Sequence, residues 1–349
     1  MPTIHFLNVL EGDCNIIQHI SNRVTVIDVS NAYNDEDTPE EKAVKASRER
    51  EEMRRRTNVP SDKIDYRQKH DPDNPIVYLK EHLGIQSIFR FVISHPDMDH
   101  MDGIRDLYDE FTIINTWDTD NNKHIPLTNN FAGYNREDWQ FYTQLRAGKV
   151  TGTTRLTYYD TGQASYFKED GIQILCPSKE LVKRANESGD YNDASYVLLY
   201  RTPGKADGQP WKIVFAGDSD DHSWEHILKN HKDDVSNIDV LFAPHHGRDS
   251  NRSYEFLKTL NPTVTLFGNA SSKHLAYGCY PGPPKGVRIT NNQAGYVVID
   301  ISEGGMSFYV KNYDFARDFR SRKGWTQPLY NTKFKAYSLF MLKSVADAK

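Results

Sequence analysis

The sequence is poor in features that mark several classes of protein. Its 349 residues include three cysteines, Cys14, Cys176 and Cys279, which are far apart and odd in number. They form neither a disulfide framework nor a paired-cysteine metal site. No apolar run approaches the roughly 20 residues needed to cross a bilayer, and the stretch from Met1 to His5 has no signal-peptide pattern. We therefore expect a cytoplasmic protein without membrane association.

The chain also has little excess charge, since its net charge is −5, but that charge is unevenly distributed. Residues 311–349 contain nine basic and three acidic side chains, a net charge of +6, which leaves −11 for residues 1–310. The basic segment also carries aromatic residues, among them Phe315, Phe319, Trp325, Tyr330, Phe334 and Tyr337. We expect a main domain over 1–310 and a basic C-terminal extension over 311–349. This extension either binds a polyanion through phosphate contacts and stacking or is an ordinary solvated appendage.

Short runs of β-branched residues recur along the chain, with helix-like stretches between several of them. This mixture predicts an α+β fold. One insertion, from about 35 to 73, interrupts the pattern. Its Thr38-Pro39-Glu40-Glu41 is a capping box with proline at the first helical position, so a helix should begin there. The helix has few apolar residues, which favours a solvated surface helix, with a partner-binding element as the alternative.

The densest group of chemically active side chains follows the apolar run Phe91–Ile93. His95, Asp97, Asp99 and His100 lie within six residues. Imidazole and carboxylate groups are ligands of divalent metals at catalytic sites, and a loop at the end of a strand can aim several of them into one cleft. We predict that these four residues bind metal; the alternative is a surface loop that is rich in Asp and His by chance.

Two further apolar runs end in ligand-type residues. Ile213–Ala216 precedes Asp218, and Val240–Ala243 precedes the pair His245 and His246. Each signal is weak alone, because Asp218 could merely cap a helix and a His pair is often structural. Three strand ends that each deliver a ligand type favour one common metal site. We expect Asp218 and His245 to bind metal and His246 to protonate the leaving group or contact phosphate.

These motifs resemble the metallo-β-lactamase fold hydrolases, whose two sheets are flanked by helices and carry metals at their strand ends. The family's His-x-His-x-Asp-His loop is similar to His95 through His100, with Asp97 in place of the second His. Asp218 matches the Asp that bridges the metals, and Asp28 matches an early Asp that supports the metal loop. The resemblance implies a four-layer αββα sandwich that holds two divalent metal ions, zinc or manganese.

Within that superfamily the chain looks most like the metallo-β-lactamase domain of ComEC-type DNA-uptake proteins. The similarity rests on the opening Leu7–Cys14, the metal loop, the strand start Asn192–Ser195 and the His-His-Gly turn, and it covers roughly residues 3–310. Asn192 or Asp193 stands where the superfamily usually has a third His. The first metal site is then rich in oxygen ligands, which should favour Mn²⁺ relative to Zn²⁺.

The residues and the resemblance together predict a binuclear metal-dependent hydrolase that uses a metal-bound hydroxide. The expected activity is that of a phosphodiesterase or nuclease acting on nucleic acid or a nucleotide. Asp99 and His246 are the expected catalytic residues, and Asn192, Ser195 and His274 are expected to contact the substrate. The alternatives are a thioester, lactone or other acyl hydrolase, and an inactive binding module of the same fold.

Overall fold

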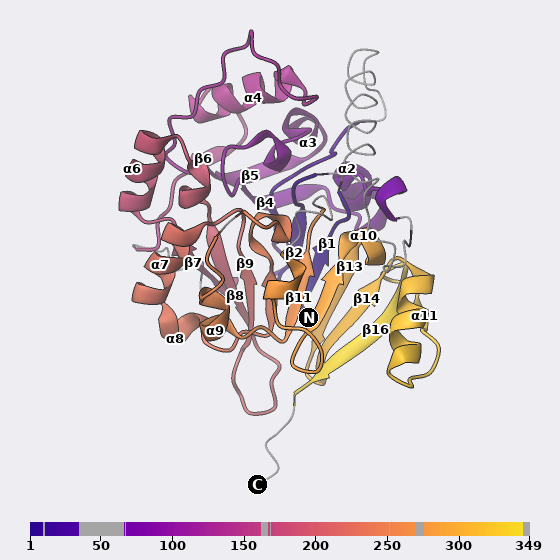
Figure 1. The fold of residues 1–349 in the computed structure, drawn as a ribbon. Helices are drawn as coiled ribbons and strands as arrows, with labels where there is room; N and C mark the ends of the chain where they lie inside the picture. The colour runs from indigo at the N-terminus through magenta and orange to yellow at the C-terminus, as the bar shows by residue number, and fades with distance from the viewer. Residues whose placement is uncertain are drawn as a thin grey trace.

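A computed structural model describes residues 1–9, 11–34, 66, 68–161, 167, 169–250, 252–269 and 276–344. Over these residues the chain forms two β-sheets and nine α-helices (Figure 1). The helix predicted to begin near Thr38 and the candidate substrate contact His274 lie outside the described residues. Within the described ranges no helix combines the length and the apolar character needed to span a bilayer.

The larger sheet has ten strands. Its order is β15 (Tyr330–Asn331), β16 (Ala336–Lys343), β14 (Gly305–Val310), β13 (Val297–Ser302), β1 (Thr3–Phe6), β2 (Asn15–Gln18), β3 (Val24–Ile27), β4 (Ser87–Val92), β5 (Thr112–Trp117) and β6 (Thr154–Leu156). Neighbours from β15 to β3 are antiparallel, whereas β3 to β6 run parallel. The carboxyl ends of β3 and β4 therefore lie at the same edge of the sheet.

The smaller sheet has six strands. Its order is β12 (Val287–Thr290), β11 (Val264–Phe267), β10 (Val240–Phe242), β9 (Trp211–Phe215), β8 (Val197–Thr202) and β7 (Ile172–Cys176). Strands β9 to β12 are parallel, and β7 and β8 are antiparallel additions. Like β3 and β4, the adjacent strands β9 and β10 end at a common edge.

Three apolar cores show that the sheets pack face to face between helices. Side chains alternate between the two faces of a strand: Val92 joins Phe215 in the core between the sheets, while its neighbour Phe91 packs with helix residues on the outer face. Val214 likewise packs outward with Ile227. The larger sheet's outer core includes residues of α2 (Pro75–Val77), α3 (Ile104–Glu110) and α4 (Arg136–Arg146).

The outer core of the smaller sheet includes residues of α6 (Lys179–Ser188), α7 (Asp221–Asn230), α8 (Lys232–Val235) and α9 (Phe256–Leu260). Two further helices, α10 (Asn291–Ala294) and α11 (Tyr313–Arg322), follow later in the chain. The order of layers is helix, sheet, sheet, helix, which confirms the predicted αββα sandwich.

The basic C-terminal segment is built into this sandwich. Strand β16 pairs with β14, and α11 lies beside β16 (Figure 1). Phe315 and Leu339 belong to the core between the sheets, whereas Trp325 and Tyr330 are about half exposed. The segment thus completes one edge of the larger sheet, while the domain boundary at 310 and the binding of a polyanion stay predictions.

A buried ion pair links the larger sheet to the start of the smaller one. Arg90 in β4 and Asp170, two residues before β7, are both fully buried at their side chains and lie 2.9 Å apart. Asp170 also accepts a hydrogen bond from the Ser21 hydroxyl at 2.7 Å and lies 3.4 Å from Arg23. Removing one partner of a buried pair leaves an uncompensated charge, which is far more costly than losing a surface pair.

We therefore expect Arg90→Met to lower the free energy of unfolding by about 3 to 5 kcal/mol. The matched control is Arg23→Met, because Arg23 is 30% exposed and also pairs with the 64% exposed Glu169; its cost should stay below about 1 kcal/mol. Urea unfolding of both variants measures the difference. Equal losses in the two variants would contradict the assignment of Arg90 as the main partner of Asp170.

Candidate metal centre

Asp28 fixes the loop that follows β4. It comes directly after β3 with a left-handed backbone (φ 59°), and its N–H donates to the Val92 carbonyl at 2.8 Å. One carboxylate oxygen accepts the Ser94 N–H at 2.7 Å, and the other lies 2.9 Å from His100 Nδ1. A carboxylate on Nδ1 orients the ring so that Nε2 is left for a metal. Asp28 therefore contacts both the start of the loop and the His100 ring, and its support of a bound metal stays a prediction.

Asp218 reaches the same place from the smaller sheet. It follows Gly217 after β9, and its side chain is only 4% exposed. Gly217 has φ 50°, and a Cβ there would lie 3.0 Å from the Ser94 Cβ and 3.2 Å from the Tyr196 carbonyl oxygen. Glycine at this position lets the ends of β4 and β9 approach each other closely.

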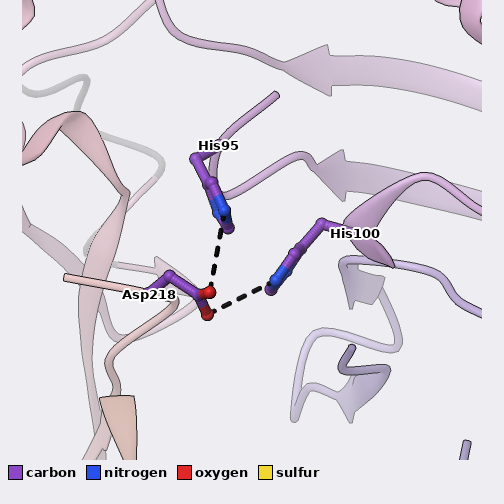
Figure 2. Close-up of side chains that lie close together, drawn as sticks. All are labelled: His95, His100 and Asp218. Carbon is purple, nitrogen blue, oxygen red and sulfur yellow. Dashed lines mark ion pairs between the residues drawn. The ribbon is translucent and has the colours of Figure 1, made fainter. Parts of the chain in front are cut away.

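Four imidazoles surround the Asp218 carboxylate. Figure 2 shows His95 and His100 pointing toward it, with Nε2 atoms 3.8 Å from Oδ2 and 3.3 Å from Oδ1 respectively. From the turn after β10, His245 Nε2 lies 3.6 Å from Oδ2 and His246 Nε2 lies 3.7 Å from Oδ1. The structure therefore brings together side chains from three strand ends, as the sequence predicted.

Asp99 extends the cluster toward solvent. Its Oδ2 lies 3.7 Å from His100 Nε2 and 3.4 Å from His246 Nε2, and its side chain is 26% exposed. Two sets of candidate ligands result, in each of which the ligand atoms lie within 4.8 Å of one another: His95, His100 and Asp218, and Asp99, His100 and His246. The sets share His100, so they lie next to each other.

The donor atoms fit divalent metal ions. Among the described residues, the buried Nε2 atoms of His95, His100 and His246 and the Oδ1 atom of Asp218 have no hydrogen-bond partner. Buried polar atoms are rarely left unsatisfied. Metal bonds of about 2.0 to 2.2 Å in tetrahedral geometry place ligand atoms about 3.4 Å apart, close to the separations in this cluster. The unsatisfied atoms are those that a metal would use.

The histidines of the cluster differ in the direction of their pKa shifts: the pKa values of His100 and His246 are raised, and that of His95 is lowered. Burial alone would lower the pKa of His100 and of His246, but nearby carboxylates, Asp218 foremost, outweigh burial and raise both pKa values well above the ordinary range. Burial raises the pKa of Asp218, yet the surrounding imidazoles reverse this and hold it well below its usual value. For His95, burial dominates and lowers the pKa.

Asp13 is a ligand candidate that the sequence analysis missed. Its Oδ1 lies 3.2 Å from His246 Nδ1, and it forms a third compact set with Asp218 and His246. The preceding Gly12 has φ 82°, and a Cβ there would collide with the Asp99 carbonyl oxygen. The available signal was the pair Gly12-Asp13, which repeats the Gly-Asp pattern seen at Asp218.

The neighbours His245 and His246 have different environments. Arg252, which is buried, places Nη2 3.0 Å from His245 Nδ1, and the Ser250 hydroxyl lies 2.9 Å from the same atom. Because a guanidinium can only donate hydrogen bonds, His245 Nδ1 accepts, and the proton of the neutral ring lies on Nε2. Burial lowers the pKa of His245 to about 4, which keeps the ring neutral near pH 7.

This arrangement favours His246 as the metal ligand, because His245 could free its Nε2 only by moving the proton to Nδ1, and Nδ1 faces the donor-only guanidinium of Arg252. His245 then acts as a hydrogen-bond donor beside Asp218. The sequence analysis expected metal binding by His245 and catalysis by His246, and both roles stay predictions. Their order in the chain carries no information about which ring meets Arg252, so only the folded geometry separates them.

Asp97 occupies the rim of the centre. It lies 3.9 Å from His95 Nε2, its side chain is 38% exposed, and it forms an ion pair with Lys123. Lys123 also lies 5.4 Å from the ring centre of Tyr191. Metal binding by Asp97 stays a prediction, and Lys123 is a charged neighbour that the sequence analysis did not find.

The predicted substrate contacts lie close in sequence to a segment that touches the metal loop. Asn192 is half-buried in a 3-10 turn, and Ser195 is fully buried just before β8. The next residue, Tyr196, donates its N–H to the Ser94 carbonyl at 2.9 Å. Contact of Asn192 and Ser195 with substrate stays a prediction.

No protein-family model and no curated protein matches this chain. Among solved structures it is similar to Igni18, a novel metallo hydrolase from the hyperthermophilic archaeon Ignicoccus hospitalis KIN4/I, with 11% identity, a TM-score of 0.41, and coverage of 86% of this chain and 100% of that one. A long form of RNase Z from yeast has 9% identity and a TM-score of 0.38 over 85% of this chain and 41% of that one.

Unliganded yeast PDE1 has 10% identity and a TM-score of 0.35 over 78% of this chain and 90% of that one. Likeness at these values carries no inference about activity.

The two adjacent histidines provide a matched test of the ligand assignment. We expect His246→Ala to weaken metal binding by more than about 100-fold, since loss of a residue that only supports a ligand typically costs 10- to 100-fold. His245→Ala should weaken it by about 10-fold or less. Both positions have left-handed backbones, with φ 55° and 52°, so the backbone strain introduced by alanine is similar. Metal titration by calorimetry measures both affinities, and equal losses would refute the assignment.

Proposed function

We propose that this protein is a metal-dependent hydrolase that cleaves phosphodiesters. The observation that carries the proposal is the convergence of His95, His100, Asp99, Asp218 and His246 from the ends of three strands into one buried cluster. When bound there, divalent metal ions would make a water molecule more acidic and polarise an ester oxygen. These five side chains would hold the metals, and Asp28 would keep the His100 ring in its orientation.

Other residues of the chain suit an anionic substrate. Asp97, Asp99 and Asp218 would repel a phosphate in the absence of metal, so the metal-free protein should be inactive. At the rim, Lys123 offers a cation beside Asp97. The protonated Nε2 of His245 offers a hydrogen-bond donor beside Asp218. A phosphodiester has non-bridging oxygens that both groups can contact, and nucleic acid is the proposed substrate class, with a nucleotide as the second choice.

A pair of neighbouring acidic residues tests the centre. Asp218→Asn should lower turnover of DNA or of bis(p-nitrophenyl) phosphate by more than about 100-fold, because a direct ligand matters more than its supporting residues. Asp220→Asn is the control, since Asp220 caps α7 through the Asp221 N–H and Asn caps a helix equally well. Full activity in Asp218→Asn would end the metal-hydrolase proposal.

The mixture of ligands predicts which metals support activity. The candidate sets contain the carboxylates of Asp13, Asp99 and Asp218 together with imidazoles. Mn²⁺ prefers oxygen ligands such as carboxylates, whereas sites typical of zinc are richer in sulfur and nitrogen ligands. After treatment with a chelator, adding Mn²⁺ should restore at least as much activity as adding Zn²⁺. Activity with zinc and none with manganese would contradict this expectation.

Salt dependence separates a nuclease from an acyl hydrolase. A protein that neutralises about six phosphates loses about 10³-fold or more in affinity between 50 and 200 mM salt, whereas a small neutral ester responds little. We expect the KM for linear and circular DNA to rise steeply over this range. A flat salt profile, with turnover of thioesters or lactones, would instead identify an acyl hydrolase. Unchanged nucleic-acid binding by Asp218→Asn, with no turnover by either protein, would identify an inactive binding module.

A further inference from the structure

A second group of metal-binding side chains lies away from the centre described above. It consists of Asp160, in the segment after β6, His226 in α7, and His231, which ends α7 and precedes α8. His226 Nε2 lies 2.8 Å from Asp160 Oδ2, and His231 Nε2 lies 3.7 Å from the same oxygen. The group shares no residue with the first centre.

The three side chains are mostly shielded from solvent. Their exposed fractions are 8% for Asp160, 19% for His226 and 14% for His231. The two imidazole centres are 6.4 Å apart, so both rings can face one ion without stacking. A partly covered group with an opening to solvent allows an ion to enter and allows water to complete its coordination.

A supporting carboxylate orients His231. Its Nδ1 lies 3.4 Å from Asp234 Oδ2. Asp234 is itself held by the Gln173 side-chain amide at 3.0 Å and by Arg201 Nη2 at 2.5 Å. A carboxylate on one ring nitrogen places the proton there and leaves the other nitrogen as a metal ligand. Asp234 therefore has the same relation to His231 that Asp28 has to His100.

The other ring nitrogen of His231, the buried Nε2, faces Asp160 but makes no hydrogen bond to any residue that the structure describes. His226 Nε2 is close enough to Asp160 to share a proton with it, and His226 Nδ1 lies 3.2 Å from the Asn230 side-chain nitrogen. A cation would replace the shared proton, because metals bind deprotonated ligands.

We propose that Asp160, His226 and His231 form a second, structural site for a divalent transition-metal ion, with Zn²⁺ as the preferred occupant. Two imidazoles and a single carboxylate, with water in the remaining position, make up a four-coordinate donor set that suits zinc, whereas the first centre gathers three carboxylates around its imidazoles. The separations of 2.8 and 3.7 Å bracket the spacing of about 3.4 Å that tetrahedral bonds of about 2.1 Å require. Small side-chain movements are enough to close the site.

The position of the site defines its role. Asp160 is anchored by its N–H to the Pro177 carbonyl at 3.0 Å, beside the amino end of α6. An ion here would join this segment to the carboxyl end of α7. The amino end of the same helix begins three residues after Asp218, and ten residues of helix span about 15 Å. The ion would therefore stabilise the helix that follows Asp218 without touching the substrate.

Zinc stoichiometry of the full chain tests the site. The double variant His226→Ala/His231→Ala should bind one zinc equivalent fewer than the parent after equilibrium dialysis at micromolar free zinc. The control is His222→Ala, because His222 lies on the same helix, is 40% exposed and pairs with Glu225; it should retain the parent's stoichiometry. The double variant should also lose part of the zinc-dependent rise in Tm. Equal zinc content in parent and double variant would overturn the proposal.

A measurement on the parent alone covers the case in which the double variant does not fold. Crystals equilibrated with micromolar Zn²⁺ should show anomalous density at the zinc edge between His226, His231 and Asp160. Density at the first centre with none at this group would overturn the second site and leave the hydrolase proposal intact. Density at this group with none at the first centre would support the second site, and the manganese-dependent activity assay would then decide the hydrolase proposal separately.

Discussion

The centre depends on one buried charge. Asp218 is almost completely removed from solvent, and burying a carboxylate costs several kcal/mol unless opposite charge and hydrogen-bond donors compensate. The compensation comes from both sheets, with His95 and His100 after β4 and the His245-His246 turn after β10. The two sheets are therefore joined electrostatically at one end of the sandwich, where Gly217 also packs against Ser94. Packing and site chemistry impose the same constraint on this end of the fold.

The two adjacent histidines both lie in a left-handed turn, and their rings point to different neighbours. Non-glycine residues with left-handed backbones are uncommon, and holding one costs on the order of 1 to 3 kcal/mol. His245 and His246 are both in this region, and β10 is held between β9 and β11 just before them. The His245 N–H also donates to the Gly217 carbonyl at 2.9 Å. Two consecutive left-handed residues send one ring toward Arg252 and the other between Asp13 and Asp99.

The sequence predicted the parts of the site that follow from strand periodicity. Apolar runs ending at His95, Asp218 and His245 indicated three strand ends that each carry a ligand-type residue, which favoured one common site. The αββα sandwich was expected from the resemblance to the metallo-β-lactamase fold hydrolases, and β4 meets β9 and β10 across its two sheets. The position of the His246 ring between Asp13 and Asp99 was not predictable, because it depends on a left-handed turn. The pairing of Asp97 with Lys123 and the meeting of Asp160 with His226 join residues 26 and 66 positions apart. Nothing in local spacing encodes such contacts.

Both groups of candidate metal ligands combine imidazoles with carboxylates. In the metal-free protein, carboxylates raise the pKa of His100 and His246, so protons balance the negative charge that a metal would balance. Between Asp160 and His226, a 2.8 Å hydrogen bond occupies the atoms that a cation would bind. Because metals bind deprotonated imidazole, occupancy at either place exchanges protons for a cation. The buried carboxylates of the first centre are thus balanced by protonated imidazoles when no metal is bound. The protein can therefore fold without the metal, and the same imidazoles lie where the cation would bind.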